Sequence, residues 1–243
     1  MKALIALQFW EGDRNAAIRL AKYISDLERG RNDFADILLV NRFDCRPIER
    51  VDAGLSRKFN LYHWRTRSRV EGWPAGCNAM WISTIEWVRS MSYGGKIPRY
   101  NFIFTCEADG APIQRDWIVR LHQSWNQANS IRPVTIAGPI VGNPEGPVYP
   151  HVNGNCLVSG AQGDLDWLLK TVPTIHPHCG WDYGIRDELA RRGWADTPDI
   201  KSYYNTPMFS REEYEKMVSD NLTWVHGDKS GCLVDYGRER FKL

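Results

Sequence analysis

This chain of 243 residues lacks several common signatures. Its six cysteines include no Cys-x-x-Cys pair, which argues against a zinc ribbon or a thioredoxin-type site and favours reduced, mostly buried thiols in a cytoplasmic protein. No apolar run approaches the length of a membrane span, so we expect no membrane partner. The 31 basic and 29 acidic residues almost balance, which does not indicate a general nucleic-acid-binding surface but leaves room for a local basic groove.

The first ten residues are apolar but lack the small-residue cleavage site of a signal peptide. They run directly into Glu11-Gly12-Asp13, and we therefore interpret them as a buried strand, followed by a helix over 15–27 that Asp13 caps. A second apolar strand follows at 34–41. This order of strand, helix and strand predicts a parallel sheet with a right-handed crossover.

Strands and helices alternate as far as residue 138, and the further expected elements are strands at 59–64, 100–106 and 134–138 and helices at 75–91 and 115–128. Residues 139–164 are rich in Gly, Pro and Asn, as expected of a loop that builds a pocket. Helices are also expected at 164–172, at 183–192 and after Ser210. The sequence therefore predicts an α/β fold: one domain over 1–243, with a mostly parallel central sheet flanked by helices.

Two carboxylates, Glu107 and Asp109, follow the apolar strand 100–106 and precede a break at Gly110 and Pro112. Open α/β sheets bind their ligands at the carboxyl ends of their strands, which is where this acidic pair is expected to lie. Carboxylate oxygens suit Mg²⁺ or Mn²⁺, and these ions usually keep open positions for substrate phosphates. An acidic turn that only caps the next helix is the alternative.

Three further segments carry polar groups that could act beside such an ion. The turn 72–79 begins a helix, where free backbone N–H groups favour an anion, although it could be an ordinary Pro-induced loop. Asp182 stands at the start of an expected helix that carries several arginines. It is either a functional carboxylate or only the N-cap of that helix. Near the C-terminus, His226 and Lys229 offer an imidazole and an ammonium group.

Together these four segments resemble the GT-A class of glycosyltransferases, which transfer a sugar from a nucleotide donor to an acceptor hydroxyl. The resemblance implies a Rossmann-like GT-A fold, with 1–138 as the nucleotide-sugar-binding half and 139–243 as the acceptor-binding half. It implies that Glu107 and Asp109 bind Mn²⁺ or Mg²⁺ and the donor diphosphate, that His226 is a third metal ligand, and that Asp182 is the catalytic base. Trp181 stands where many members have Glu, and the spacing from His226 to Lys229 is shorter than the class pattern.

The resemblance also implies contacts to the donor, most simply a UDP-sugar that carries a hexose or a pentose. The residues expected to make them are Gln8, Trp10, Arg65, Arg67, Trp73, Gly76, Asn78, Asn153, Asn155 and Lys229. Some of these residues have simpler interpretations. Arg65 and Arg67 could form a solvated face, and Asn153-Gly154 is a strong turn signal in any protein. Asp164, Asp187 and Glu188 are weaker candidates for the base.

Minimal GT-A enzymes include phage proteins that glycosylate hydroxymethylated pyrimidines in double-stranded DNA, so modified DNA in a host cytoplasm is one candidate acceptor. Arginines between 42 and 69 and at 186, 191, 192, 238 and 240 could hold its phosphates, and eleven Trp could supply stacking surfaces. A surface glycan or a small molecule is the alternative acceptor. Two rival classes are a sugar-nucleotide nucleotidyltransferase, whose Gly-rich loop is missing from 7–12, and a non-catalytic nucleotide-binding module. The sequence leaves the anomeric outcome and the oligomeric state open.

Overall fold

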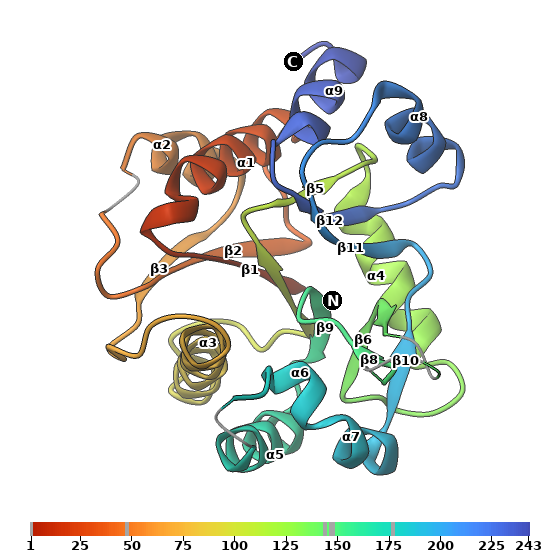
Figure 1. The fold of residues 1–243 in the computed structure, drawn as a ribbon. Helices are drawn as coiled ribbons and strands as arrows, with labels where there is room; N and C mark the ends of the chain where they lie inside the picture. The colour runs from red at the N-terminus through yellow and green to blue at the C-terminus, as the bar shows by residue number, and fades with distance from the viewer. Residues whose placement is uncertain (1, 47–48, 143–144, 146–148, 176–177) are drawn as a thin grey trace.

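Seven strands form the central sheet of the protein, in the order β10-β6-β9-β4-β1-β2-β3 (Figure 1). The computed structural model describes residues 2–46, 49–142, 145, 149–175 and 178–243, with the backbone alone for 49–53. Only β9 runs antiparallel to its neighbours among these seven strands. The strands are β1 (Ala3–Phe9), β2 (Ala35–Asn41), β3 (Leu61–Arg65), β4 (Phe102–Glu107), β6 (Ile136–Gly138), β9 (Cys156–Ser159) and β10 (Trp194–Asp196).

Helices cover both faces of this sheet because its central strands are apolar on both sides. In β1, Ile5 and Leu7 point into one core cluster, whereas Leu4 and Ala6 point into the other. The first cluster is closed by α1 (Arg14–Leu27), α2 (Glu49–Lys58) and α4 (Trp117–Ala128). The second is closed by α3 (Ala75–Tyr93), α5 (Gln162–Thr171), the 3-10 turn η2 (Val172–Thr174), α6 (Trp181–Gly184) and α7 (Arg186–Arg192). In Figure 1 these two groups lie above and below the sheet.

A smaller sheet crosses the end of β4 and has the order β11-β12-β5. It contains β5 (Gly110–Pro112), β11 (Ile200–Thr206) and β12 (Trp224–Asp228). Along the chain, α8 (Arg211–Ser219) lies between β11 and β12, and α9 (Cys232–Phe241) follows β12. A two-stranded ribbon joins β7 (Ile140–Val141) to β8 (His151–Val152). The short sheet brings the C-terminal part of the chain to the segment that follows β4, which is the acidic segment singled out above.

The predicted strands and helices up to residue 138 are present, with ends shifted by at most two residues. Other expectations were wrong. The Gly-rich segment 139–164 is not only a loop, because β9 lies fully buried between β4 and β6. The expected helix 183–192 is two helices, α6 and α7, and α2 lies between the strands expected at 34–41 and 59–64, where no element was expected. No element was expected at β10, β11 or α9.

Two further observations concern single features. Asp13 stands at the N-cap position of α1, at the end of the 3-10 turn η1 (Glu11–Asp13), but its side chain makes no capping hydrogen bond, so the expected cap is wrong in that detail. In the part of the chain that the structure describes, none of the helices combines the length and the apolar character needed to cross a membrane.

Candidate active site

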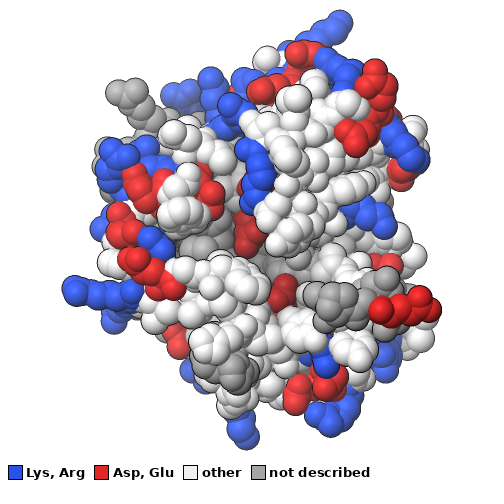
Figure 2. Space-filling view, in the orientation of Figure 1, with Lys and Arg blue, Asp and Glu red and all other residues white. Residues whose placement is uncertain are grey.

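The candidate site lies where the strand order of the main sheet reverses. From β1 the chain adds β2 and then β3 on one side, and it returns to place β4 on the other side. The carboxyl ends of β1 and β4 therefore flank the switch point at which open α/β sheets bind their ligands. Gln8 and Glu107 stand opposite each other in the register of these two strands. Figure 2 shows a hollow near the middle of this face, with carboxylate atoms deep inside it.

Three side chains converge at the end of β4. The ligand atoms of Glu107, Asp109 and His226 all lie within 4.8 Å of one another. The Nε2 atom of His226 is 3.0 Å from Oε2 of Glu107 and 3.1 Å from Oδ1 of Asp109. The pairing of the strands explains this meeting of distant residues, because β12 runs antiparallel to β5 and places His226 opposite Gly110.

The charges of these groups are strongly coupled. Burial alone raises the pKa of Asp109, but hydrogen bonds and charge from His226 and Lys229 outweigh burial and hold the pKa at about 2. Burial lowers the pKa of His226, yet the hydrogen bonds and charges of Asp109 and Glu107 raise it to about 9. Near neutral pH the imidazole is therefore a cation between two carboxylates, and the proton on its Nε2 atom competes with a divalent ion for these three groups.

The donor set fits a hard divalent cation. The two carboxylates suit Mn²⁺ and Mg²⁺, the imidazole favours Mn²⁺ of these two, and a set of three protein ligands leaves positions for phosphate oxygens and water. Ser202 on β11 lies 2.9 Å from the Nδ1 atom of His226, so it can fix the ring with Nε2 toward the carboxylates. Metal-binding histidines commonly have such a partner on the second ring nitrogen.

Further contacts hold the acidic segment in place. The side-chain oxygen of Asn155 accepts a hydrogen bond of 3.0 Å from the backbone N–H of Glu107. Lys229 contacts the second oxygen of Asp109 at 2.5 Å. The buried carboxylate of Asp228 accepts hydrogen bonds from the N–H groups of residues 230, 231 and 233, and so fixes the turn that carries Lys229 into α9. A cavity of about 220 Å³ adjoins this group, between the start of α1 and the turn 228–231.

Asp182 lies on the other side of Glu107, in the first turn of α6. Its Oδ2 atom accepts a hydrogen bond of 3.1 Å from the N–H of Gly154, and its Oδ1 atom accepts one of 2.9 Å from the N–H of Tyr183. Burial raises the pKa of Asp182, and the negative charge of Glu107 raises it further. A carboxylate whose pKa is raised is a stronger base than an exposed one, so Asp182 is suited to accept a proton.

Asn78 and two tryptophans place α6 against α3. The side-chain oxygen of Asn78 accepts from the N–H of Trp181 at 2.8 Å, and its amide nitrogen donates to the carbonyl of Cys179 at 2.8 Å. The rings of Trp81 and Trp181 stack with centroids 3.8 Å apart. These contacts set the position of Asp182, which directly follows Trp181.

The residues predicted to bind the nucleotide fall into two groups. Trp10 and Trp73 have 46% and 80% of their surface exposed, which leaves their rings available for stacking. Arg65 and Arg67 are also exposed; Arg65 donates to the carbonyl of Cys45, and Arg67 lies over the ring of Trp64. All four stand at or after the carboxyl ends of β1 and β3, which belong to the same half of the sheet.

The second group already makes hydrogen bonds inside the protein. Gln8 is buried and its amide donates to Thr84 at 2.9 Å, and the N–H of Gly76 is bonded to the carbonyl of Gly72. The Asn153 side chain accepts from the N–H of Asn155, and Asn78 and Asn155 make the contacts given above. Their predicted contacts with a nucleotide stay predictions. The three weaker base candidates form ion pairs on the surface: Asp164 with Arg192, Asp187 with Arg186 and Glu188 with Arg191.

The sequence analysis missed three residues that support the site. Ser202 and Asp228 position His226 and Lys229, and Thr84 binds Gln8. Asp228 carries no simple signal, because it lies four residues before the first residue of α9, outside the N-cap position that Asp commonly takes. Ser202 carries none, since β11 is polar and mostly exposed.

No family model matches the sequence, and no curated protein matches it. Solved structures do show a similar fold. A glycosyltransferase involved in the glycosylation of the major capsid of PBCV-1 aligns over 100% of both chains, with a TM-score of 0.54 and 9% identity. Mouse xyloside xylosyltransferase 1 aligns over 95% of this chain and 99% of its own, with a TM-score of 0.53 and 10% identity.

GlyE of Streptococcus pneumoniae TIGR4 aligns over 98% of this chain, with a TM-score of 0.55 and 10% identity. The chain spans less than two thirds of some similar structures, namely 60% of GlyE and 61% of residues 1–349 of S. aureus TarS. At these identities the similarity shows the fold. The predicted GT-A fold, with its mostly parallel sheet, is confirmed.

Proposed function

We propose that the protein is a metal-dependent glycosyltransferase that moves a sugar, a hexose or a pentose, from a nucleotide donor to an acceptor hydroxyl. One observation carries the proposal: Glu107, Asp109 and His226 meet at the switch point of a sheet whose fold matches that of known glycosyltransferases. Such a triad suits Mn²⁺ or Mg²⁺ holding a diphosphate, and UDP is the nucleotide that the resemblance of the sequence implies.

The departing nucleotide diphosphate gains negative charge as the bond from the anomeric carbon to the phosphate oxygen breaks. When bound, the metal ion acts as a Lewis acid toward these phosphate oxygens. Lys229 lines the cavity of about 220 Å³ beside Asp109, so its ammonium can also reach a phosphate oxygen there. The 220 Å³ cavity beside both residues gives the diphosphate space to bind.

Asp182 is the proposed base for the acceptor hydroxyl. Its carboxylate is held by two backbone N–H groups, so the atom that takes the proton is fixed before the acceptor binds. Attack on the side of the sugar opposite the leaving group would invert the anomeric configuration. In the proposed division of the chain, Trp10, Arg65, Arg67 and Trp73 lie on the nucleotide side, in the half 1–138, and Asp182 lies in the acceptor half 139–243.

A specific observation weakens DNA as the acceptor. Each of the five arginines at 186, 191, 192, 238 and 240 has a carboxylate partner at 2.7–3.4 Å, so their charges are largely compensated. In Figure 2, Lys and Arg side chains lie around the margin of the hollow with acidic ones among them, without forming a continuous basic track. Binding of a DNA backbone depends on such a track. Modified DNA stays an untested prediction, and we favour a glycan or small-molecule acceptor.

Nucleotide-sugar turnover tests the proposal directly. We expect a panel of UDP-sugars to show Mn²⁺-dependent release of UDP, which Asp109→Asn and Glu107→Gln reduce by at least about 100-fold, since each removes a charged ligand of the ion. Glu86→Gln, which changes an exposed carboxylate on α3, is the matched control and should retain full activity. Turnover that is independent of metal, or that survives in both site variants, contradicts the proposal.

The same samples separate the rival classes. A nucleotidyltransferase would release pyrophosphate from a nucleoside triphosphate and a sugar phosphate, and a binding module would bind UDP without turnover. Asp182→Asn should bind the donor with unchanged affinity but lose transfer to the acceptor. If it loses both to the same degree, Asp182 has only a structural role.

A further inference from the structure

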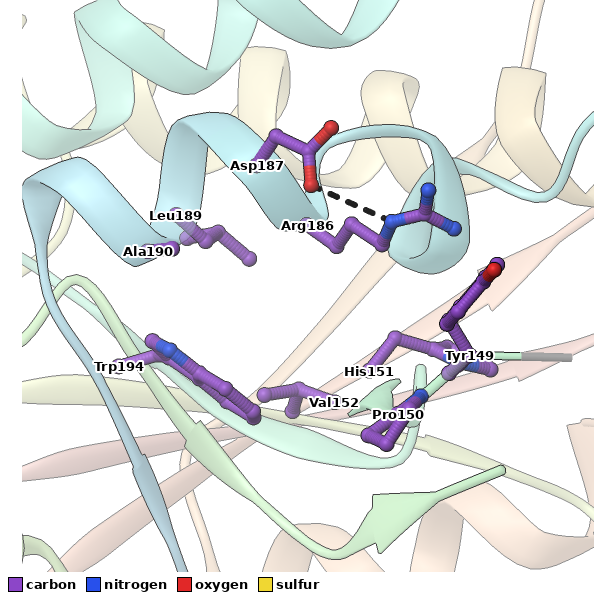
Figure 3. A pocket seen from close by; sticks show the side chains of 9 residues that line it. All are labelled: Tyr149, Pro150, His151, Val152, Arg186, Asp187, Leu189, Ala190 and Trp194. Atoms are coloured by element: carbon purple, nitrogen blue, oxygen red, sulfur yellow. Dashed lines mark hydrogen bonds and ion pairs between the residues drawn. The ribbon is translucent and has the colours of Figure 1, made fainter. Parts of the chain in front are cut away.

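A second cavity, of about 310 Å³, lies between α7 and the two strands β8 and β10. Figure 3 shows Leu189, Ala190 and the stem of Arg186 on one side of this cavity, with Trp194 and Val152 on the other. Its volume is at the lower end of the range of about 300–1,000 Å³ that is typical of small-molecule sites. It is a site for a compact group and not for a long segment of polymer.

This cavity adjoins the proposed base. His151 lines the cavity, and its ring contacts the ring of Tyr183 with centroids 5.2 Å apart. Tyr183 directly follows Asp182 in α6, and Gly154, three residues after His151, donates its N–H to the Asp182 carboxylate. The loop that forms one wall of the cavity therefore also holds Asp182, so a sugar ring in the cavity would be bound by the same loop that positions the proposed base.

The walls of the cavity combine an apolar surface with fixed polar groups. The indole of Trp194 and the side chains of Leu189 and Val152 provide the apolar part. The guanidinium of Arg186 lies over the rings of Tyr183 and Tyr149, at 4.4 and 5.1 Å from their centroids. Held between two rings, Arg186 loses little conformational freedom when it donates to a ligand.

We propose that this cavity binds a sugar ring of the acceptor, so that the acceptor of the reaction is a carbohydrate. The inference rests on the proposed glycosyltransferase function and specifies its acceptor class. A pyranose has an apolar C–H face, which packs against an indole, and a rim of hydroxyls, which bind planar groups such as the Arg186 guanidinium and the Asp187 carboxylate. These two side chains lie 3.3 Å apart at one end of the cavity, and Asp187 is exposed, so both can bind neighbouring hydroxyls of one ring.

The charge of the cavity also favours a sugar over a flipped base of DNA. Beside Arg186 it contains Asp187, so a phosphate backbone that approached the cavity would meet a carboxylate. A flipped base needs a slot between two flat surfaces, as enzymes that act on bases provide. Here the indole of Trp194 faces the aliphatic side chains of α7 (Figure 3).

The proposed transfer involves only the acceptor sugar, the nucleotide-sugar donor and Asp182. A hydroxyl oxygen of the bound sugar ring forms the new bond to the anomeric carbon of the donor. The bond from that carbon to the phosphate oxygen breaks, and its electron pair leaves with the nucleoside diphosphate. The hydroxyl proton passes to Asp182. No oxidant, reductant or further reactant is required.

A substitution that fills the cavity tests the proposal. Ala190 is exposed on α7 but lines the cavity, so Ala190→Trp blocks it without disturbing the core. Arg191→Trp, at the next and also exposed position, is the control. The probes are p-nitrophenyl pyranosides of glucose, galactose, mannose, N-acetylglucosamine and xylose, followed by saturation-transfer NMR and by UDP release from UDP-sugars with Mn²⁺.

We expect at least one pyranoside to bind and to accept sugar, with binding weakened at least about tenfold in Ala190→Trp and unchanged in Arg191→Trp, because the indole takes the volume of the ring. UDP release in the absence of acceptor should be equal in all three proteins. The inference is overturned if no pyranoside binds, if Ala190→Trp binds as the wild type does, or if DNA with 5-hydroxymethylcytosine is glycosylated by wild type and Ala190→Trp alike. Pyranoside binding without any metal-dependent UDP release would instead refute the proposed function alone.

Discussion

Protonation of His226 should control the affinity of the site for metal. In the metal-free protein the imidazole is held as a cation by Glu107 and Asp109, which raise its pKa to about 9. Only the neutral imidazole can bind a metal ion, so the ion must displace this proton. The apparent affinity for Mn²⁺ should therefore rise with pH throughout the range from 6.5 to 9.

The size of the effect follows from the pKa. With a pKa of about 9, competition by the proton weakens binding about 300-fold at pH 6.5 and about fourfold at pH 8.5, so the affinity rises about 75-fold between them. A histidine with the ordinary pKa of about 6.5 would give only about a twofold rise. Asp109, with a pKa of about 2, stays ionised over this range and adds nothing to the change.

Titration with Mn²⁺, followed by the electron paramagnetic resonance signal of the free ion, measures this affinity at pH 6.5, 7.5 and 8.5. His226→Gln should remove most of the pH dependence, and His63→Gln, at an exposed position on β3, should preserve it. Calorimetry in two buffers of different ionisation enthalpy should detect about one proton released per ion bound at pH 7.5. A rise of less than about fivefold in the wild type would refute the reasoning.

The same coupling affects stability. The pKa of His226 is higher in the folded state than in the unfolded chain. The contribution of His226 to the free energy of unfolding is therefore fully present below about pH 6.5 and is lost as the pH rises through about 9. The loss is at most about 3 kcal/mol. Urea unfolding of the metal-free protein should show it, and Mn²⁺ should restore stability above pH 8 by binding the folded state.

Three further predictions concern other parts of the molecule. Because burial raises the pKa of Asp182, the rate of transfer should decline as the pH falls through a value above 3.8. Asp182→Asn should abolish nearly all transfer, and any residual activity should lack this decline at low pH. Residual activity with the pH profile of the wild type argues against Asp182 as the base. Asp36 is fully buried and lies 2.7 Å from both the Lys2 ammonium and the Tyr100 hydroxyl. In urea unfolding, Asp36→Ala should lower the free energy of unfolding by about 3–5 kcal/mol and Tyr100→Phe by about 1–2 kcal/mol. A loss below about 1 kcal/mol for Asp36→Ala would be contrary evidence. Gly227 has a φ of +105°, and a Cβ atom there would lie 1.9 Å from a carbonyl oxygen of β11. Gly227→Ala should therefore move β11 away from His226 and weaken Mn²⁺ binding. An unchanged affinity for Mn²⁺ in a folded variant would contradict this.

The central strands could be predicted because they are buried on both faces and read as continuous apolar runs. β9 could not be predicted, since its four residues stand among glycines, prolines and asparagines. Hydrogen bonds to β4 on one side and β6 on the other hold them in a strand, and these pairings leave no local signal. β11 has the sequence Ile-Lys-Ser-Tyr-Tyr-Asn-Thr and is mostly exposed, so it shows no alternation of apolar residues. The pairing with β12 stabilises it, and pairing between distant segments leaves no local signal.

The acidic pair was predictable for a similar reason, because a strand end followed by Gly and Pro is a local pattern. His226 was expected as the third ligand from the resemblance, but no local pattern in the sequence shows that it reaches this pair. The interval between His226 and Lys229 is shorter than the class pattern, yet β12 still brings His226 within 3.1 Å of both carboxylates, because it pairs with β5, which follows Asp109 directly. The spacing along the chain is therefore a weaker guide to this ligand than the register of two antiparallel strands.

Buried amides show where sequence reasoning about a site reaches its limit. Gln8, Asn78 and Asn155 stand in segments that the sequence assigns to the nucleotide, and a polar side chain in such a segment suggests a ligand contact. In the structure they are buried, and each is hydrogen-bonded to another part of the site: Thr84, Trp181 or the N–H of Glu107. A contact with the nucleotide would have to replace these bonds, each worth about 1 kcal/mol net. Exposed groups such as Trp73 face no such cost, so the donor's direct contacts should be sought first among them.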